Sequence, residues 1–318
     1  MINTSQCRRT FGVDKQSVKD EKRLATTQSM GAEPAHSMRV LRTFWILILG
    51  LILASCSGTT FVYNRLDVIL PWYIDDYADL NGHQDAYLDE VLAPFLNWHR
   101  QQELPAYLSV IEDIEAHLDD TLTGADVAEI FSEFEAAWLR IEAKGLGWLL
   151  DLGGQLSDKQ MANVIEALWE QQEEFEEEYL ERDDAEFYED SYDNLLDNVE
   201  EFLGNVSDAQ REQLRLAANQ LQRSDVEWLK ERADWIEELS VLLEAEPGWE
   251  RAVRDAVRQR REKPALKYRE IYTHNMTIIF NAVAVVVNSR SERQDKYLRN
   301  RLAEVREDLQ ALADQGAL

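Results

Sequence analysis

Cysteine, histidine and proline are scarce in this chain of 318 residues. It contains two cysteines, Cys7 and Cys56, together with five histidines and six prolines. Cys7 falls in an N-terminal leader and Cys56 at its end, so the rest of the chain has no cysteine pair that could form a disulfide. The scarcity also excludes a nucleophilic cysteine, and the fold must be held by its own apolar core.

Motifs of familiar catalytic sites are missing as well. The chain has no His-Glu-x-x-His, Gly-x-Ser-x-Gly, P-loop or Gly-x-Gly-x-x-Gly sequence. A ferritin-like di-iron centre needs Glu three residues before His, but an apolar residue occupies that place before His83, His99, His117 and His274. Each of the four instead has a carboxylate four residues away, which predicts ion pairs on helix faces.

We therefore expect no catalytic residues, no metal and no cofactor. A pair of carboxylates of the glycoside-hydrolase kind is the remaining catalytic alternative, but no two acids stand out from the many others.

Positive charge is the other deficit. The chain has 33 basic and 61 acidic residues, a net charge of −28. Such a surface repels nucleic-acid phosphates and anionic headgroups, so we expect no nucleic-acid partner and no membrane binding driven by charge alone. With 45% hydrophobic residues and nine tryptophans, the chain still has enough apolar area to fold.

Residues 38–55 have the layout of a bacterial signal peptide. Arg39 and Arg42 precede the apolar run 44–53, which is shorter than the ~20 residues of a membrane-spanning helix. The run ends in Leu53-Ala54-Ser55-Cys56, which resembles the lipobox of bacterial lipoproteins, where the signal is cleaved before a cysteine that then carries lipid. The resemblance implies that an acylated Cys56 anchors the chain in a membrane. An uncleaved N-terminal anchor is the alternative.

The anchor divides the chain. Residues 1–37 are polar, and we interpret them as a disordered or mis-assigned extension, with Met38 or Met30 as the true start. In Gram-negative lipoproteins an aspartate after the lipidated cysteine retains the protein in the inner membrane, so Ser57 implies the outer membrane, facing the periplasm. We expect residues 56–60 to form a tether and residues 61–318 a single domain.

Helical periodicity dominates the sequence after the tether. We predict an all-α fold, an elongated bundle of about seven to nine helices. The expected elements are 61–80, 84–101, 104–118, 123 to the glycines at 145–154, 157–203 with a break at 183–184, 207–243, 249–261, 266–287, and a last helix from Ser289 or Ser291.

The segment 272–287 ends in twelve nearly all-apolar residues, too few to span a bilayer. We expect a core helix packed on all sides at the centre of the bundle, with the segment 160–203 outermost. A buried strand is the alternative because the segment is rich in Val and Ile, but no other strand is predicted to pair with it.

Three helix starts share the form Ser-x-x-Gln, at Ser157, Ser207 and Ser291. Each reads as a capping box, in which Ser accepts a hydrogen bond from the third amide and Gln reaches back to the first. The form also resembles the Leu-Thr-x-x-Gln signature of periplasmic stress chaperones of the Spy kind. The spacings are too uneven for a solenoid repeat.

Acidic and basic residues are concentrated in separate segments. Between residues 170 and 201 there are 16 acidic residues and one base, Arg182. No calcium-loop pattern occurs there. A basic segment follows at 251–269, and it includes Arg254, Arg258 and Arg261. We predict that it pairs with the acidic segment; an exposed patch for an anionic partner is the alternative.

The most distinctive residues lie in the segment 98–105, Trp98-His99-Arg100 followed by Glu103-Leu104-Pro105. Together with 63–67 and 80–84, it resembles a family of uncharacterised proteobacterial lipoproteins. The resemblance covers most of residues 56–310 and implies an all-helical, lipid-anchored protein without a known activity. The segment forms either an interaction surface near the anchor or a helix corner, with Trp98 in the core and His99 or Arg100 paired to Glu103.

These inferences predict a lipid-anchored, non-catalytic protein that binds or scaffolds an unidentified envelope protein. The candidate surfaces are the corner at 98–103 and the basic segment with Arg254, Arg258 and Arg261. A Spy-like chaperone is the second hypothesis and requires an exposed concave apolar surface. A hydrolase acting on envelope polymers is the third and requires two carboxylates converging in a cleft.

Overall fold

The computed structural model describes residues 58–244, 248–263 and 265–316. The predicted extension 1–37, the signal peptide 38–55 and the lipidation site Cys56 lie outside these residues. The tether is shorter than predicted, because Gly58, Thr59 and Thr60 already belong to the first helix.

The described residues are helical almost throughout and contain no strand, which confirms the all-α prediction. Eleven α-helices have eleven residues or more, so the expected seven to nine is too low. The elements are α4 (Gly58–Tyr63), α5 (Leu66–Ala78), α6 (Gly82–Trp98), the π-helix η1 (His99–Glu103), α7 (Leu104–His117), α8 (Gly124–Gly153), α9 (Asp158–Leu180), α10 (Asp184–Leu203), α11 (Asp208–Ala218), α12 (Asp225–Leu243), α13 (Trp249–Glu262), α14 (Leu266–Asn288) and α15 (Glu292–Gln315).

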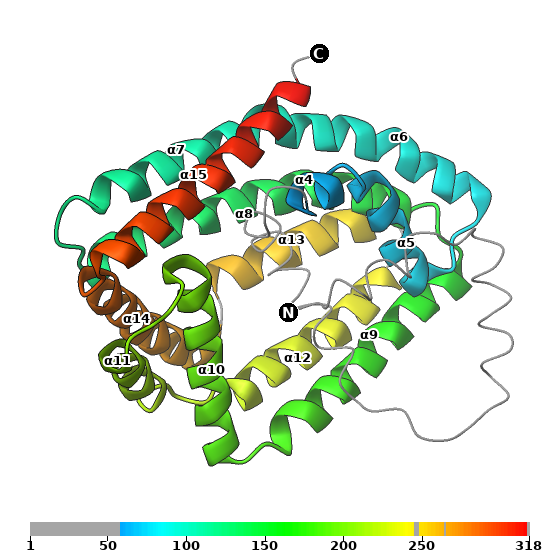
Figure 1. The fold of residues 1–318 in the computed structure, drawn as a ribbon. Helices are drawn as coiled ribbons and strands as arrows, with labels where there is room; N and C mark the ends of the chain where they lie inside the picture. Colours follow the sequence, from blue (N-terminus) through cyan, green and yellow to red (C-terminus); the bar gives the residue numbers. More distant parts are fainter. Residues whose placement is uncertain (1–57, 245–247, 264, 317–318) are drawn as a thin grey trace, which may run out of the picture.

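The helices form a closed circuit of pairwise contacts rather than an elongated bundle (Figure 1). α5 packs on α6 and α9, and α9 packs along α12, which contacts α13 and α14. α14 packs on α8 and α11, α11 on α10, α10 on α15, and α15 along α7. The largest apolar cluster lies where α7, α10, α11, α14 and α15 meet, with Leu104, Leu214, Val286 and Leu309 fully buried.

The prediction of a central α14 packed on all sides is wrong. By length and composition α14 is the one helix in the described part that could cross a membrane, and 22% of that apolar window is buried. Its inner face, with Ile271, Ala282 and Val286, packs against the circuit, whereas Val285 is 49% exposed. α14 is therefore a peripheral helix with one buried face.

The predicted long helix 207–243 is two helices. α11 ends at Ala218 and α12 begins at Asp225. Asn275 of α14 stabilises the linker, because its side chain accepts a hydrogen bond from Gln222 N at 2.8 Å and donates one to Gln222 O at 2.8 Å. This contact joins residues 53 apart in the sequence, and no glycine or proline marks the break.

Other predicted boundaries are confirmed. The helix pattern slips at Asp183, whose side chain caps α10 by accepting from Glu186 N. Ser291 rather than Ser289 opens the last helix. α8 continues through Gly145 and Gly147 to Gly153, because glycine weakens a helix without ending it when neighbouring helices support it.

All three predicted capping boxes are present, at Ser157, Ser207 and Ser291, and two more are formed by Asn81 with Gln84 and by Thr123 with Asp126. Each glutamine accepts a hydrogen bond from its own N-cap amide, at 2.9–3.0 Å. The boxes satisfy amides that have no partner within the helix.

The four glutamines also join in pairs across the fold. Gln84 Nε2 lies 3.2 Å from Gln160 Oε1, and Gln160 Nε2 donates to Gln84 Oε1 at 2.8 Å, which links the starts of α6 and α9. Gln294 Nε2 donates to Gln210 Oε1 at 2.9 Å, which links the starts of α15 and α11. Gln84 is 1% exposed and Gln210 is 2% exposed. We call these the two glutamine junctions.

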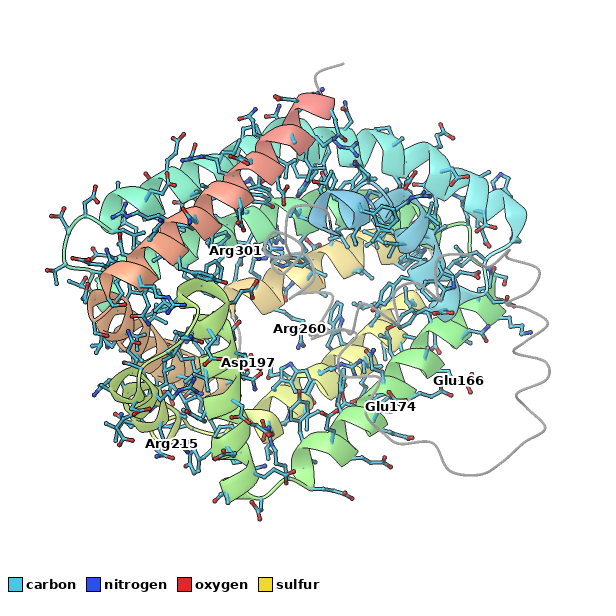
Figure 2. The ribbon with its side chains drawn as sticks, viewed as in Figure 1. Glu166, Glu174, Asp197, Arg215, Arg260 and Arg301 are labelled. Carbon is cyan, nitrogen blue, oxygen red and sulfur yellow. The ribbon has the colours of Figure 1, made fainter. Side chains whose placement is uncertain are left out.

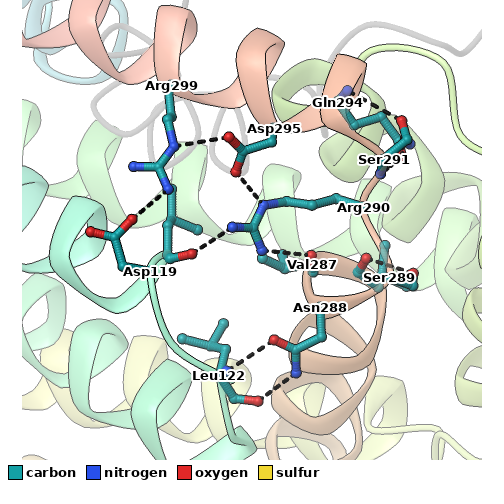
Figure 3. Close-up of polar contacts among 12 residues, drawn as sticks. Asp119, Leu122, Val287, Asn288, Ser289, Arg290, Ser291, Gln294, Asp295 and Arg299 are labelled. Carbon is teal, nitrogen blue, oxygen red and sulfur yellow. Dashed lines mark hydrogen bonds and ion pairs between the residues drawn. The ribbon is translucent and has the colours of Figure 1, made fainter.

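The second glutamine junction is extended by the turn between α14 and α15 (Figure 3). Arg290 donates to Asp295 at 2.7 Å and to the carbonyl oxygen of Leu118 at 2.5 Å. Asn288 accepts from Leu122 N at 2.9 Å and donates to Leu122 O at 2.7 Å. The turn between α14 and α15 is thus tied to the loop between α7 and α8.

A double-mutant cycle at the second glutamine junction tests its role. Gln210→Ala and Gln294→Ala should each lower the free energy of unfolding by about 2 kcal/mol, because each removes the hydrogen bond between the two glutamines and the acceptor of its own N-cap amide. The double variant should lose less than the sum of the two. Urea denaturation provides the measurement, with the exposed Gln310→Ala as a control that should change it by less than about 0.5 kcal/mol. Strict additivity of the two losses would show that the glutamines do not interact.

Candidate functional site

The Trp98 corner, which we define as residues 98–107, is a continuous helix rather than a turn between two helices. α6 passes into α7 through the π-helix His99–Glu103. Pro105 has no amide hydrogen and cannot bond to the carbonyl of Gln101, so the helix can widen here. This extra width turns His99 and Glu103 inward, and both are buried.

His99 is held between two tyrosines from different helices. Tyr63 Oη of α4 lies 2.8 Å from Nδ1, and Tyr107 Oη of α7 lies 3.3 Å from Nε2. A neutral imidazole has one donor and one acceptor nitrogen, so one tyrosine donates to the ring and the other accepts from it. His99 is 9% exposed, and both tyrosines are 6% exposed.

Burial determines the protonation of this cluster. Burial, and to a smaller extent the nearby charge of Arg100, lowers the pKa of His99 from its ordinary value of 6.5 to about 4. Burial also raises the pKa of Tyr63 and of Tyr107 well above the usual range. The three rings are therefore neutral around pH 7.

The corner also fastens both ends of the described chain. Arg100 lies over the ring of Tyr63 at 5.1 Å and donates to Asn64 Oδ1 at 3.1 Å, which holds α4. Gln101 Nε2 donates to the carbonyl of Gly316 at 2.8 Å, which holds the end of α15. The first described helix, α4, is thus fixed to the body of the protein.

Glu103 pairs with Arg140 of α8 and not with His99 or Arg100, so that part of the corner prediction is wrong. The pairing is bidentate, with Arg140 Nε at 3.0 Å from Oε1 and Nη2 at 2.8 Å from Oε2. The Glu103 side chain is 3% exposed. Trp98 is half-buried beside Phe95, with Lys144 5.6 Å above its ring.

The predicted histidine–carboxylate pairs are replaced by other contacts at three of the four positions. His99 contacts tyrosines, His117 Nδ1 lies 2.7 Å from the carbonyl of Asp113, and His274 Nε2 lies 3.1 Å from the carbonyl of Gln220. No group of three or more metal-ligating side chains occurs within the described ranges.

α13 has an apolar inner face. Trp249, Val253 and Ala256 are buried, and Trp249 packs with Leu150 of α8. Gly153 makes room for this ring, since a β-carbon there would lie 2.6 Å from Trp249 Cη2.

The opposite face of α13 carries Arg251, Arg254 and Arg258, all exposed and spaced three and four residues apart. We call these three residues the basic stripe. Arg258 forms an exposed pair with Asp255 at 2.7 Å. Arg251 and Arg254 have no ion pair with any other residue that the structure describes.

The expected pairing between the basic and acidic segments is wrong. Arg260 contacts Glu231 and Glu238 of α12, and Arg261 contacts Glu142 of α8 at 2.5 Å. Figure 2 shows Arg260 on the inner side of the circuit, between α13 and α12. The closed circuit places α13 beside α12 and α8 rather than beside the acidic helices.

Some acidic residues of the segment pair with arginines of other helices. Arg211 pairs with Glu200 and Arg215 with Glu189 across the contact between α11 and α10. Arg301 of α15 pairs with Glu201 at 3.4 Å.

The single base of the acidic segment, Arg182, has a buried structural position that sequence reasoning missed. It pairs with Asp190 at 2.7 Å and with the buried Asp225 at 3.1 Å, and it lies 5.2 Å from the ring of Phe187. Arg223 joins the same cluster through Asp184 and Asp225. The cluster fixes the bend between α9 and α10 to the start of α12.

The predicted site residues therefore separate into two kinds. His99 and Glu103 are buried and hold helices together, whereas the basic stripe faces outward. Arg140 and Glu142, two residues apart on α8, contact the corner and Arg261 respectively, so one helix supports both regions. In the sequence, Tyr63 lies 36 residues and Tyr107 8 residues from His99, and Arg140 lies 37 residues from Glu103. Nothing in the sequence links these partners.

A surface depression lies elsewhere, along α14. Its volume is about 590 Å³, and it is lined by Arg269, Glu270, Thr273, His274, Thr277 and Ile278. It includes Arg269 at the end of the basic segment but no residue of the Trp98 corner or of the basic stripe.

The low pKa of His99 predicts a pH-dependent contribution to stability. In the unfolded chain His99 binds a proton below its ordinary pKa of 6.5, whereas in the native state it stays neutral down to about pH 4. The free energy of unfolding therefore falls as the pH falls from about 6.5 to about 4. Between pH 7.5 and 5.5 this group should remove about 1 kcal/mol from the free energy of unfolding.

His99→Gln should remove that part of the pH dependence in urea denaturation. The exposed His83→Gln is the control and should retain it. If the free energy of unfolding of His99→Gln still changed between pH 7.5 and pH 5.5 as much as that of the wild type, His99 would not be a neutral buried histidine.

Comparison with known proteins gives a family but no activity. Residues 76–269, more than half of the chain, match the model of a family of unknown function, DUF6279. No curated protein and no solved structure matches the chain. The matched region runs from α5 to α14 and includes the Trp98 corner and the basic stripe. The chain thus belongs to the DUF6279 family, whose function is unknown.

Proposed function

We propose that this protein is a lipid-anchored, non-catalytic binding or scaffolding module of the bacterial cell envelope. The lipobox-like segment ending at Cys56 supports the anchor, and Ser57 supports the outer membrane with the domain facing the periplasm. In this account the helical body presents one binding surface to an anionic region of another envelope protein.

The basic stripe is the observation that carries the proposal. It is an exposed row of three arginines on a chain of net charge −28, and two of them have no carboxylate partner among the described residues. Cations that are not needed for internal pairing attract an acidic partner and increase its association rate. Arginine is also the base best suited to bidentate contacts with carboxylates.

The Trp98 corner supports the proposal in a different way. Its buried His99 contacts Tyr63 and Tyr107, and its buried Glu103 forms a bidentate pair with Arg140 of α8. We therefore assign the corner to holding α4, α8 and the end of α15 in place, and not to recognition or acid–base chemistry.

The Spy-like hypothesis loses its motivating observation. The glutamines of the three Ser-x-x-Gln motifs cap helices, and two of them, Gln210 and Gln294, are buried against each other. Suppression of client aggregation by the purified protein remains the direct test of a chaperone role.

Charge reversal of the basic stripe tests the proposed surface. In cells, chemical cross-linking with mass spectrometry should capture an envelope protein on α13 of the wild-type chain. Arg251→Glu/Arg254→Glu/Arg258→Glu should reduce those cross-links about tenfold or more, because three attractions become repulsions.

Arg293→Glu/Lys296→Glu is the matched control, since both residues are exposed bases on α15. It should leave the cross-links to α13 unchanged. Equal yields from the wild type and the stripe variant, at equal protein levels, would contradict the proposed surface.

A further inference from the structure

Helices α4 and α5 have two opposite faces. The inner face carries Tyr63, Leu66, Leu70 and Ile74, which pack into the apolar clusters of the body. The outer face carries Phe61, Arg65, Val68 and Trp72, at successive spacings of four, three and four residues. Phe61 belongs to α4, Arg65 lies at the break between the two helices over the ring of Phe61, and Val68 and Trp72 lie one turn apart on α5; all four are exposed. We call them the anchor-proximal stripe.

The anchor-proximal stripe exposes large apolar side chains. Phe61 is 49% exposed, and Val68 and Trp72 are each 54% exposed. Arg65 is also exposed, and its guanidinium lies 5.6 Å from the ring of Phe61. A tryptophan, two further apolar groups and an arginine in one row match the boundary between acyl chains and phosphate headgroups.

The chain outside the described residues determines what this face meets. α4 begins at Gly58, so Ser57 alone separates it from Cys56. Two residues span at most about 7 Å. If Cys56 carries acyl chains, the start of α4 is therefore held at the bilayer surface, and α5 follows it with little freedom because Tyr63 and Arg100 fasten α4 to the body.

We propose that the anchor-proximal stripe lies on the phospholipid surface and sets the orientation of the whole domain. This inference rests on the proposed acylation of Cys56. Val68 and Trp72 contact the headgroup–acyl boundary, and Arg65 contacts phosphate oxygens. The exposed Asp67 beside the stripe keeps the insertion shallow.

This contact fixes what the domain presents to the periplasm. α11 lies on the opposite side of the circuit from α5 (Figure 1), so it points away from the bilayer. An acyl anchor alone holds the protein on the membrane but does not select a rotation, whereas an apolar row near the anchor does.

A single-cysteine probe tests the inference, because the cleaved chain has no cysteine other than Cys56. Val68→Cys and Leu216→Cys, both at exposed positions, are each purified from membranes and labelled with an environment-sensitive fluorophore. Mass spectrometry first establishes that Cys56 is acylated. The proteins are then reconstituted into phosphatidylethanolamine/phosphatidylglycerol vesicles that contain a headgroup spin label.

The probe at position 68 should be quenched about threefold more than the probe at position 216, which lies on α11. In the background Phe61→Ser/Trp72→Ser, quenching at position 68 should fall toward the value at position 216, although the acyl anchor is unchanged. Equal quenching at the two positions, or full quenching without Phe61 and Trp72, would overturn the inference. Absence of acylation in the first step would instead contradict the proposed anchor.

Discussion

The interaction on which this fold depends is the hydrogen bond between two glutamine side chains, each at the start of a different helix. In each glutamine the amide group makes two kinds of contact. Its oxygen accepts from the N-cap amide of its own helix, and its nitrogen reaches the glutamine of a second helix start. Gln84 with Gln160, and Gln210 with Gln294, thereby join helices that are 76 and 84 residues apart in sequence. A buried amide without partners is costly, so each pair specifies which two helix starts can meet. The closed circuit of helices follows from these two junctions and the apolar faces that pack between them.

Local features were predictable, and distant contacts were not. Some features depend only on residues within three or four positions of one another, which can be read from the sequence. They are the capping boxes at Ser157, Ser207 and Ser291 and the break at Asp183. The linker that divides 207–243 contacts Asn275, 53 residues away, and the partner of Glu103 is Arg140, 37 residues away. The apolar run in α14 suggested a core helix because composition records how apolar a segment is and not how many neighbours cover it. Basic and acidic segments likewise pair according to the circuit, which brings Arg260 to α12.

The interior and the surface have different roles in this account. The Trp98 corner, the Arg182 cluster and the glutamine junctions hold the helices in place through contacts among polar side chains of different helices. The features left over are on the surface: the basic stripe on α13, and the anchor-proximal stripe on α4 and α5. A rigid body between them would present the basic stripe at a fixed position relative to the membrane, which is what a binding or scaffolding module requires.

The central claim is that this domain is held at a membrane by an acylated Cys56. Intact mass spectrometry of the protein purified from membranes tests it most directly. We predict a mature chain that begins at Cys56 and carries the added mass of its acyl chains, and an unprocessed, unacylated precursor for Cys56→Ala. A wild-type protein that retains residues 38–55, or a Cys56→Ala variant that is still acylated, would contradict the account.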